Sequence, residues 1–266
     1  MGLSFSVNAQ YYYKDVVSNK ALLDEMAQLK DQKIKKVNIK SFEDDGSPSD
    51  GFFCEKKISR NYTFVQTTTK SNISGASIFS SSFSSKGLLE KTVDSSDLAV
   101  TTSLYTYDEN DKLKNIRSTV HSSDDDFTND IVEVHTYYYD EKGFPFKMTR
   151  LKGNADSTTI LFSLDDRNNV SIEKDTRTGK SYYYYYDAKK RLTDVVHLNE
   201  FNQQMLPDYM FEYNNAGNIS QMTTTEEGGS YYYIWKYTYD NGLRTKEKCF
   251  SKERRLMGSI EYEYTN

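Results

Sequence analysis

Three histidines, His121, His135 and His197, are the residues of this chain best suited to bind a metal or to transfer a proton. Their spacing matches no zinc motif. His135 and His197 fall in segments with the pattern of strands, and His135 occupies a position that recurs along the chain, so we expect a packed or partly exposed structural histidine there. The sequence also lacks the Gly-x-Ser-x-Gly, Gly-x-Gly-x-x-Gly and Walker patterns. We therefore predict a protein that is not an enzyme and that uses no metal and no cofactor.

Two acidic stretches, Asp124 to Asp126 and Asp165 with Asp166, have the oxygen ligands that calcium prefers. Neither has the spacing of an EF-hand loop, and the aspartates that follow repeated strands already have a role in turns. Glycoside hydrolysis needs two carboxylates that face each other across a cleft. The sequence places no such pair, so a glycoside-processing enzyme is the least favoured alternative.

Aromatic side chains are the other candidates for binding, because the chain has 23 tyrosines and 14 phenylalanines. Rings that recur on one face of a strand are expected to form the core of a sheet. Rings on the second face, when exposed, can stack on sugars or on a protein partner. The residues predicted to bind a ligand are Tyr138, Tyr183, Tyr185 and Trp235.

The elements that must position these residues repeat along the chain. Aligned on the residue that precedes a turn, the repeated positions are Phe83, Tyr107, Tyr139, Leu164, Tyr186, Tyr213, Tyr239 and Tyr264. These positions are 22 to 32 residues apart, a period typical of arrays of supersecondary units. Apolar and polar residues alternate before each turn, as in a half-buried antiparallel sheet. Asp or Asn then begins the turn, and Gly or Asn near its end tolerates positive φ.

The repeat resembles the YD repeat of RHS-type proteins over roughly residues 79–266. The similarity is clearest at Tyr186-Asp187, Tyr139-Asp140 and Tyr213-Asn214, each followed by an apolar residue after the turn. The usual Gly-Arg pair is reduced here to Lys190-Arg191, and the chain is far too short for the large RHS shell that encloses a toxin. The resemblance implies a sheet of hairpin repeats, as in small secreted YD-repeat proteins of Bacteroidota-like bacteria.

We predict three regions. Residues 1–9 resemble the end of a signal peptide, with Val7 and Ala9 as the small residues before a cleavage point and Gln10 as the mature start. Residues 10–70 are expected to form a helix from Asp15 to about Lys36 and strands that cap the array. Residues 71–266 are expected to form the repeat sheet. The predicted fold class is mainly β: tandem antiparallel hairpins in one long, twisted or curled sheet, with one N-terminal helix.

The composition of the chain disfavours some classes of binding partner. The net charge is −5 and the pI is about 5.4, which disfavours a nucleic-acid partner. No apolar run approaches the roughly 18 residues of a transmembrane helix. The two cysteines, Cys54 and Cys249, could pair in an oxidising compartment or remain free thiols.

The repeat, the export signal and the lack of a catalytic constellation predict an exported scaffold or binding protein. It would act in the periplasm or at the cell surface, associated with the outer membrane, and bind a protein partner. The alternative is a carbohydrate-binding protein that uses exposed tyrosines.

Overall fold

The computed structural model describes residues 10–72, 75–123, 130–153, 156–199, 204–226 and 231–266. The predicted signal remnant and the acidic stretch Asp124 to Asp126 lie outside these ranges. The helical elements are the π-helix η1 (Tyr12–Val17) and the α-helix α1 (Ser18–Asp31). The strands are β1 (Lys36–Phe42), β2 (Phe53–Ile58), β3 (Phe64–Ser71), β4 (Gly75–Phe83), β5 (Leu89–Ser96), β6 (Ala99–Tyr107), β7 (Leu113–Ser122), β8 (Ile131–Tyr139), β9 (Pro145–Lys152), β10 (Asp156–Leu164), β11 (Val170–Asp175), β12 (Ser181–Tyr186), β13 (Leu192–Leu198), β14 (Met205–Tyr213), β15 (Ile219–Thr225), β16 (Tyr232–Asp240), β17 (Leu243–Phe250) and β18 (Leu256–Thr265).

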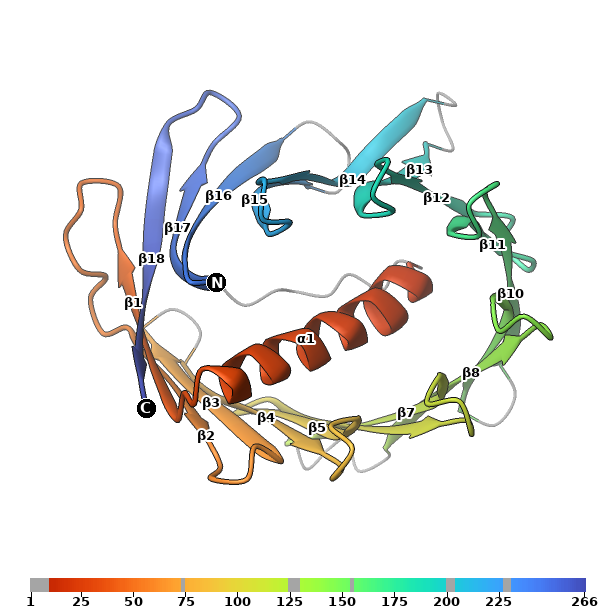
Figure 1. Cartoon of the computed structure of the whole chain (residues 1–266), viewed down its shortest axis with the longest axis horizontal. Coiled ribbons are helices and arrows are strands. Elements are labelled where there is room, and N and C mark those ends of the chain that lie inside the picture. Colours follow the sequence, from red (N-terminus) through yellow and green to blue (C-terminus); the bar gives the residue numbers. More distant parts are fainter. Residues whose placement is uncertain (1–9, 73–74, 124–129, 154–155, 200–203, 227–230) are drawn as a thin grey trace. The chain divides into compact units, whose positions relative to one another are not determined.

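The predicted fold, one long, twisted or curled sheet with capped ends, is wrong, because the ladder of strands returns to its start. Over the described residues, the structure has one antiparallel sheet of 18 strands, in which β1 pairs with both β2 and β18 and β10 pairs with β9. Figure 1 shows β18 beside β1. The sheet is therefore a closed barrel rather than a capped array, and closure pairs the two edges that an open sheet would leave exposed.

The predicted helix is present with different bounds. It begins at Tyr12 as a π-helix and ends at Asp31, and β1 begins at Lys36. Met26 and Leu29 are its buried apolar residues, which agrees with the helical spacing of its apolar positions. The end follows from Lys33, whose φ is 60°, because a left-handed residue stops an α-helix.

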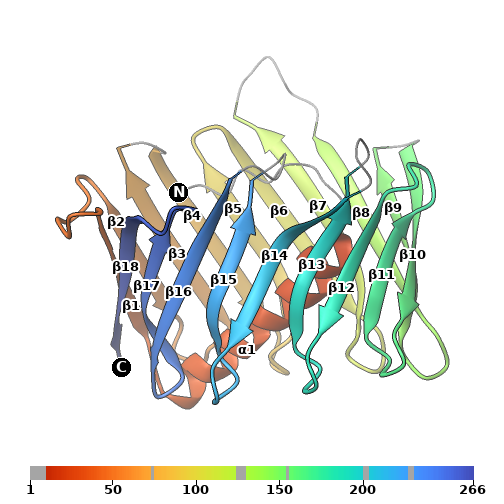
Figure 2. The same cartoon turned by 90° about the horizontal axis from the view of Figure 1, so that it is seen from above.

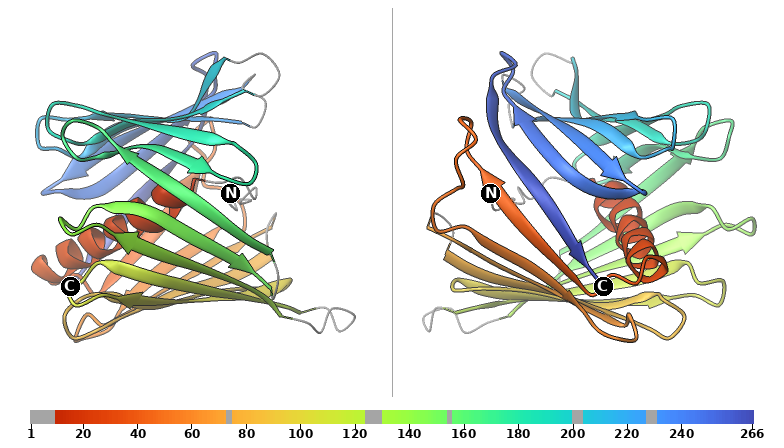
Figure 3. Two further views of the ribbon diagram at one scale, coloured as in Figure 1. Left: turned by 90° about the vertical axis from the view of Figure 1, so that its right-hand side faces the viewer. Right: turned by 60° about the vertical axis from the view of Figure 1, so that its left-hand side comes forward.

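Contacts divide the chain into two compact units. Unit 1 comprises the residues up to Ile39, Asp50–Ile160 and Glu263–Asn266, and unit 2 comprises Lys40–Ser49 and Leu161–Tyr262. Within unit 1, α1 lies against one face of the sheet (Figure 3); we call this the helix-side face. Within unit 2, strands β12 to β16 run side by side (Figure 2).

The repeated turns form as the sequence predicts. Asp108, Asp165 and Asp187 each accept two backbone N–H bonds through one carboxylate oxygen, at 2.8 to 3.0 Å. The residue three positions later has positive φ, 64° at Asn168 and 62° at Lys190. Asp165 thus serves a turn, as the sequence indicated.

The tyrosine before four of the turns has a structural role that the sequence did not reveal. Its hydroxyl donates to the backbone carbonyl of the apolar residue that follows the preceding repeat turn. The four pairs are Tyr139 to Leu113, Tyr186 to Val170, Tyr213 to Leu192 and Tyr239 to Ile219, at 2.7 to 2.9 Å. Each hydroxyl joins one hairpin to the one before it, which explains why tyrosine rather than phenylalanine recurs at this position.

Lys190→Gly is expected to stabilise the protein by about 1 kcal/mol. Lys190 holds a left-handed conformation that costs a residue with a Cβ roughly 1–2 kcal/mol, and glycine removes most of that cost. Chemical denaturation would measure the gain. Gly217→Ala, at the same turn position with φ 91°, should lower stability; equal midpoints for both variants would contradict this account.

Candidate functional site

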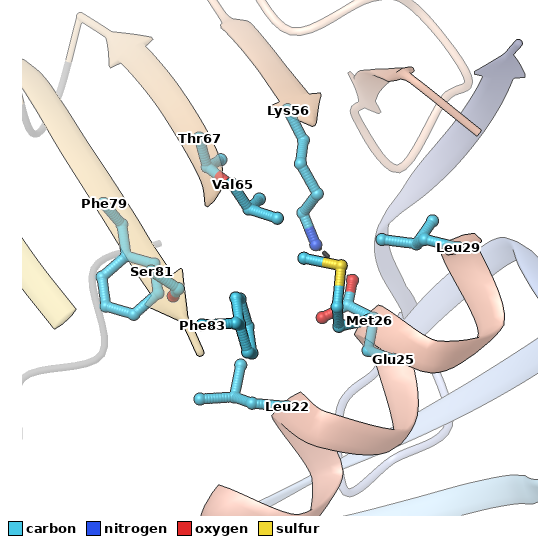
Figure 4. Close-up of a pocket in the computed structure, with 10 residues that line it drawn as sticks. All are labelled: Leu22, Glu25, Met26, Leu29, Lys56, Val65, Thr67, Phe79, Ser81 and Phe83. Carbon is cyan, nitrogen blue, oxygen red and sulfur yellow. Dashed lines mark hydrogen bonds and ion pairs between the residues drawn. The ribbon is translucent and has the colours of Figure 1, made fainter. Parts of the chain in front are cut away.

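A hollow lies between α1 and the helix-side face of unit 1 (Figure 4). Its volume is about 40 Å³ and it opens to solvent. Most of its lining is apolar: Leu22, Met26, Leu29, Val65, Phe79 and Phe83. The polar residues at its wall are Glu25, Lys56, Thr67 and Ser81. This lining is mixed as in a small-molecule site, but the hollow is far smaller than the roughly 300–1,000 Å³ of such sites and has room for a few water molecules.

Lys56 is the positively charged residue of this lining. It reaches from β2 to α1 and donates to the Glu25 carboxylate. Its side chain is 19% exposed, whereas that of Glu25 is 46% exposed. The adjacent Lys57 points to the opposite face, where it is 71% exposed and lies 2.7 Å from Glu55. The strand thus presents one lysine to the hollow and one to solvent.

A second polar cluster joins η1 to strands β8 and β9 on the helix-side face. The His135 ring lies 2.6 Å from Asp15 through Nδ1 and 2.8 Å from Glu133 through Nε2. Tyr137 donates to the same oxygen of Asp15, and Arg150 donates to Glu133. Because both ring nitrogens face carboxylates, His135 carries both protons and a positive charge.

The electrostatics of this cluster agree with its geometry. Burial alone would lower the pKa of His135, but the charge of Asp15 and the hydrogen bonds to Asp15 and Glu133 raise that pKa to about 9. The hydrogen bond from His135 lowers the pKa of Glu133 to about 2, against the effect of burial. With an exposure of 12%, His135 is the packed structural histidine that the sequence predicted.

The four predicted binding residues do not share one surface. Tyr138 lies in unit 1 on the face opposite His135, 37% exposed, with the Lys147 ammonium 4.1 Å from its ring. Tyr183 and Tyr185 lie in unit 2 on the face opposite Tyr184. Their role in binding stays a prediction.

Tyr185 belongs to an extended row on its face of unit 2. It is 49% exposed, and successive pairings place it in line with Asp194, Met210 and Ile234. Met210 is 38% exposed. Tyr183 pairs with Val196, which is 7% exposed. We call the set Tyr183, Tyr185, Val196, Met210 and Ile234 the Tyr185 patch.

Trp235 belongs to the other face of unit 2. It pairs with Met222 and Cys249, and successive pairings place it on the same face as Tyr184. Trp235 and Tyr185 therefore cannot contact one ligand from the same side of the sheet.

The remaining chemical candidates have structural partners. His121 lies 2.9 Å from Asp130, and His197 lies 2.9 Å from Asp208. Both cysteines are free thiols, and burial raises the pKa of Cys249 to about 11, so its reactive thiolate is scarce. Among the described residues, no group of three or more acids, histidines and cysteines is placed to hold a metal. No helix in the described part of the chain is long and apolar enough to span a membrane.

Sequence reasoning did not identify the hollow. The helical spacing of Leu22, Met26 and Leu29 indicated an apolar stripe, and Phe79 and Phe83 fitted the repeat. Nothing in the local pattern brings these two segments together with Lys56, because the contact depends on how α1 lies on the sheet.

Comparisons with known proteins give structural likenesses only. No family model matches the sequence, and no curated protein matches it. A porin-like protein from Bacteroides uniformis has a TM-score of 0.43 at 11% identity, covering 87% of this chain and 96% of that one. A porin-like protein from Bacteroides vulgatus has a TM-score of 0.29 at 13% identity, covering 87% and 98%. A chain of the TcdB2-TccC3-Cdc42 crystal structure has a TM-score of 0.35 at 14% identity; 80% of this chain matches 12% of that chain's length.

Proposed function

We propose that this protein is an exported, non-enzymatic barrel built on a YD-like repeat, and that it binds a protein partner in the periplasm or at the cell surface. The Tyr185 patch is the observation that carries this proposal. Tyr185 and Met210 are exposed on regular strands, so ordering them on binding costs little. Tyrosine supplies rigid contact area and methionine adapts to the shape of a partner.

The charges on both faces favour a barrel that contacts water over one that spans a bilayer. The face of the Tyr185 patch also carries Asp194, Glu212, Lys236, Lys246 and Glu261. The opposite face of unit 2 carries Glu173, His197 and Glu247. Neither face is the uninterrupted apolar band of a transmembrane barrel. In unit 1, the face away from α1 carries Lys57, Lys91, Arg117 and Lys147.

Photo-crosslinking in the producing cells tests this proposal. p-Benzoylphenylalanine at position 185 should give a discrete protein adduct in the envelope fraction. The same group at position 231, where the tyrosine is 61% exposed and outside the patch, is the matched control. Met210→Ala should reduce the adduct at position 185 about tenfold or more if Met210 is a hot spot.

Other outcomes would change the proposal in defined ways. Equal adducts at positions 185 and 231, or protein recovered only from the cytoplasm, would contradict it. Retention on an envelope polysaccharide that is lost in Tyr183→Ala and Tyr185→Ala would instead support the carbohydrate-binding alternative, because exposed tyrosine rings stack on sugars.

A further inference from the structure

We propose that the face of unit 1 turned away from α1 docks on a bilayer surface of anionic phospholipids. The inference goes beyond the proposed function and does not depend on it, since this face belongs to unit 1 and the Tyr185 patch to unit 2. It rests on one row of side chains that crosses strands β3 to β9 and on the balance of charges around that row.

The row lies at one level of the sheet. Neighbouring strands are about 4.8 Å apart, so a row across these strands is roughly 30 Å long. Val65 lines the hollow under α1, and the adjacent Phe64 begins the row on the other face, turned away from the helix (Figure 1). Successive pairings define the set that we call the Leu104 row: Phe64, Lys91, Leu104, Arg117 and Leu151.

This face presents large apolar side chains to solvent. Five of them, each on a different strand, are 38–47% exposed: Phe53, Phe64, Ile78, Leu104 and Leu151. Large apolar side chains that are exposed together on one face mark an interaction surface. Because they are spread over several strands, they match a broad partner surface better than a single projecting side chain.

The charged residues of the same face determine the charge of the partner. Its cations on β2 to β9 are Lys57, Lys70, Lys91, Arg117 and Lys147. At the paired positions that the structure describes on this face of β2 to β9, Glu55 is the one acid, and it already pairs with Lys36 and Lys57. The whole chain has a net charge of −5, so the excess of positive charge is a property of this face. The partner is therefore anionic.

Unit 2 shows that this imbalance is local. Its face with the Tyr185 patch also carries exposed lysines, among them Lys236 and Lys248. There the lysines are balanced by acids, namely Asp194, Glu212 and Glu261.

The mixture of cations and apolar side chains along the Leu104 row favours a bilayer surface. Lysine and arginine reach lipid phosphates, while leucine and phenylalanine enter the boundary of the acyl chains. Lys91 and Arg117 lie within the row and would be costly in the hydrocarbon core, so the face lies on the membrane and does not cross it. A soluble polyanion would contact the cations and leave the apolar side chains in water.

Flotation of the full chain with lipid vesicles tests the proposal. Vesicles of phosphatidylglycerol and phosphatidylethanolamine should carry the protein at about 0.05 M salt and release it at about 0.5 M, and vesicles of phosphatidylcholine should not carry it. Lys91→Gln with Arg117→Gln should weaken binding to the anionic vesicles about 25-fold, since each cation near such a surface contributes about fivefold. Lys236→Gln with Lys248→Gln is the matched control, because it removes the same charge from an exposed cross-strand pair of unit 2.

Leu104→Ser separates a bilayer from a soluble polyanion. It removes an exposed apolar side chain and should weaken vesicle binding about fivefold, the loss of part of a leucine's transfer free energy, without a change in affinity for heparin. The proposal is overturned if the wild type does not float with the anionic vesicles, or if the two double variants float equally. It is also overturned if Leu104→Ser floats as well as the wild type, because the face would then recognise charge alone, as for a soluble polyanion.

Discussion

His135→Ala is expected to lower the free energy of unfolding by about 3–5 kcal/mol, the cost of removing one partner from a buried ion pair. The imidazolium lies between Asp15 and Glu133, and its side chain is 12% exposed. Without the ring, Asp15 and Glu133 lose the cation that lies between them in a largely buried site, where Arg150 is the nearby cation. The change also removes a contact that fixes η1 to the sheet.

Thermal and urea unfolding would measure this loss, with His121→Ala as the matched control. His121 also pairs with an aspartate at 2.9 Å, but its side chain is 62% exposed. An exposed pair contributes about 0–1 kcal/mol, so His121→Ala should lie near the wild type. Losses of similar size in the two variants would show that burial of the His135 cluster does not contribute to the stability of the protein.

The shifted pKa values of His135 and Glu133 determine the sign of the pH dependence of stability. The folded pKa of His135, about 9, exceeds the ordinary value of 6.5. Its stabilisation is therefore complete below pH 6.5 and is lost as the pH rises to about 9. The folded pKa of Glu133, about 2, lies below the ordinary 4.5, so its contribution is lost as the pH falls from 4.5 to 2. Unfolding midpoints of His135→Ala should show a weaker decline between pH 6.5 and 9 than those of the wild type.

Tyr184→Phe is expected to cost about 2–3 kcal/mol although it removes a single oxygen atom. The Tyr184 hydroxyl donates to Glu173 at 2.7 Å, and these residues are 2% and 1% exposed. Removing the donor of a buried hydrogen bond costs about 1–3 kcal/mol.

The neighbouring residue is the control for that experiment. Tyr185→Phe removes the same atom one position along the strand, where the side chain is 49% exposed, and should change stability by less than about 0.5 kcal/mol. Urea midpoints of the two variants would separate the two faces of β12. Similar midpoints would contradict the burial of Tyr184 and Glu173 as a hydrogen-bonded pair.

The run of five tyrosines shows what the local sequence pattern can predict and what it cannot. Alternation along a strand assigns Tyr182 and Tyr184 to one face and Tyr183 and Tyr185 to the other, and the structure agrees, with Tyr184 buried and Tyr185 exposed. The same reasoning could not show that Glu173 faces Tyr184, because that contact depends on the register between β11 and β12. It also could not separate Trp235 from Tyr185, since their faces follow from successive pairings across unit 2.

The hollow under α1 could not be predicted from the local sequence pattern. Its apolar residues were visible as a helical stripe and as repeat positions, but Lys56 and Glu25 looked like ordinary charged residues of a strand and a helix. Lys56 lines the hollow and Lys57 does not, because α1 lies on the face of the sheet to which Lys56 points.

By itself the sequence determined the repeated strands, their aspartate turns, the N-terminal helix and the packed role of His135. All of these depend on contacts between residues near in sequence or on strict alternation. Tertiary structure decided that the sheet closes through β1 and β18, that the repeated tyrosines bond the preceding hairpin, and that Lys56 meets Glu25. These depend on pairings between distant segments, and an alternating strand has the same pattern at the edge of an open sheet and in a closed barrel.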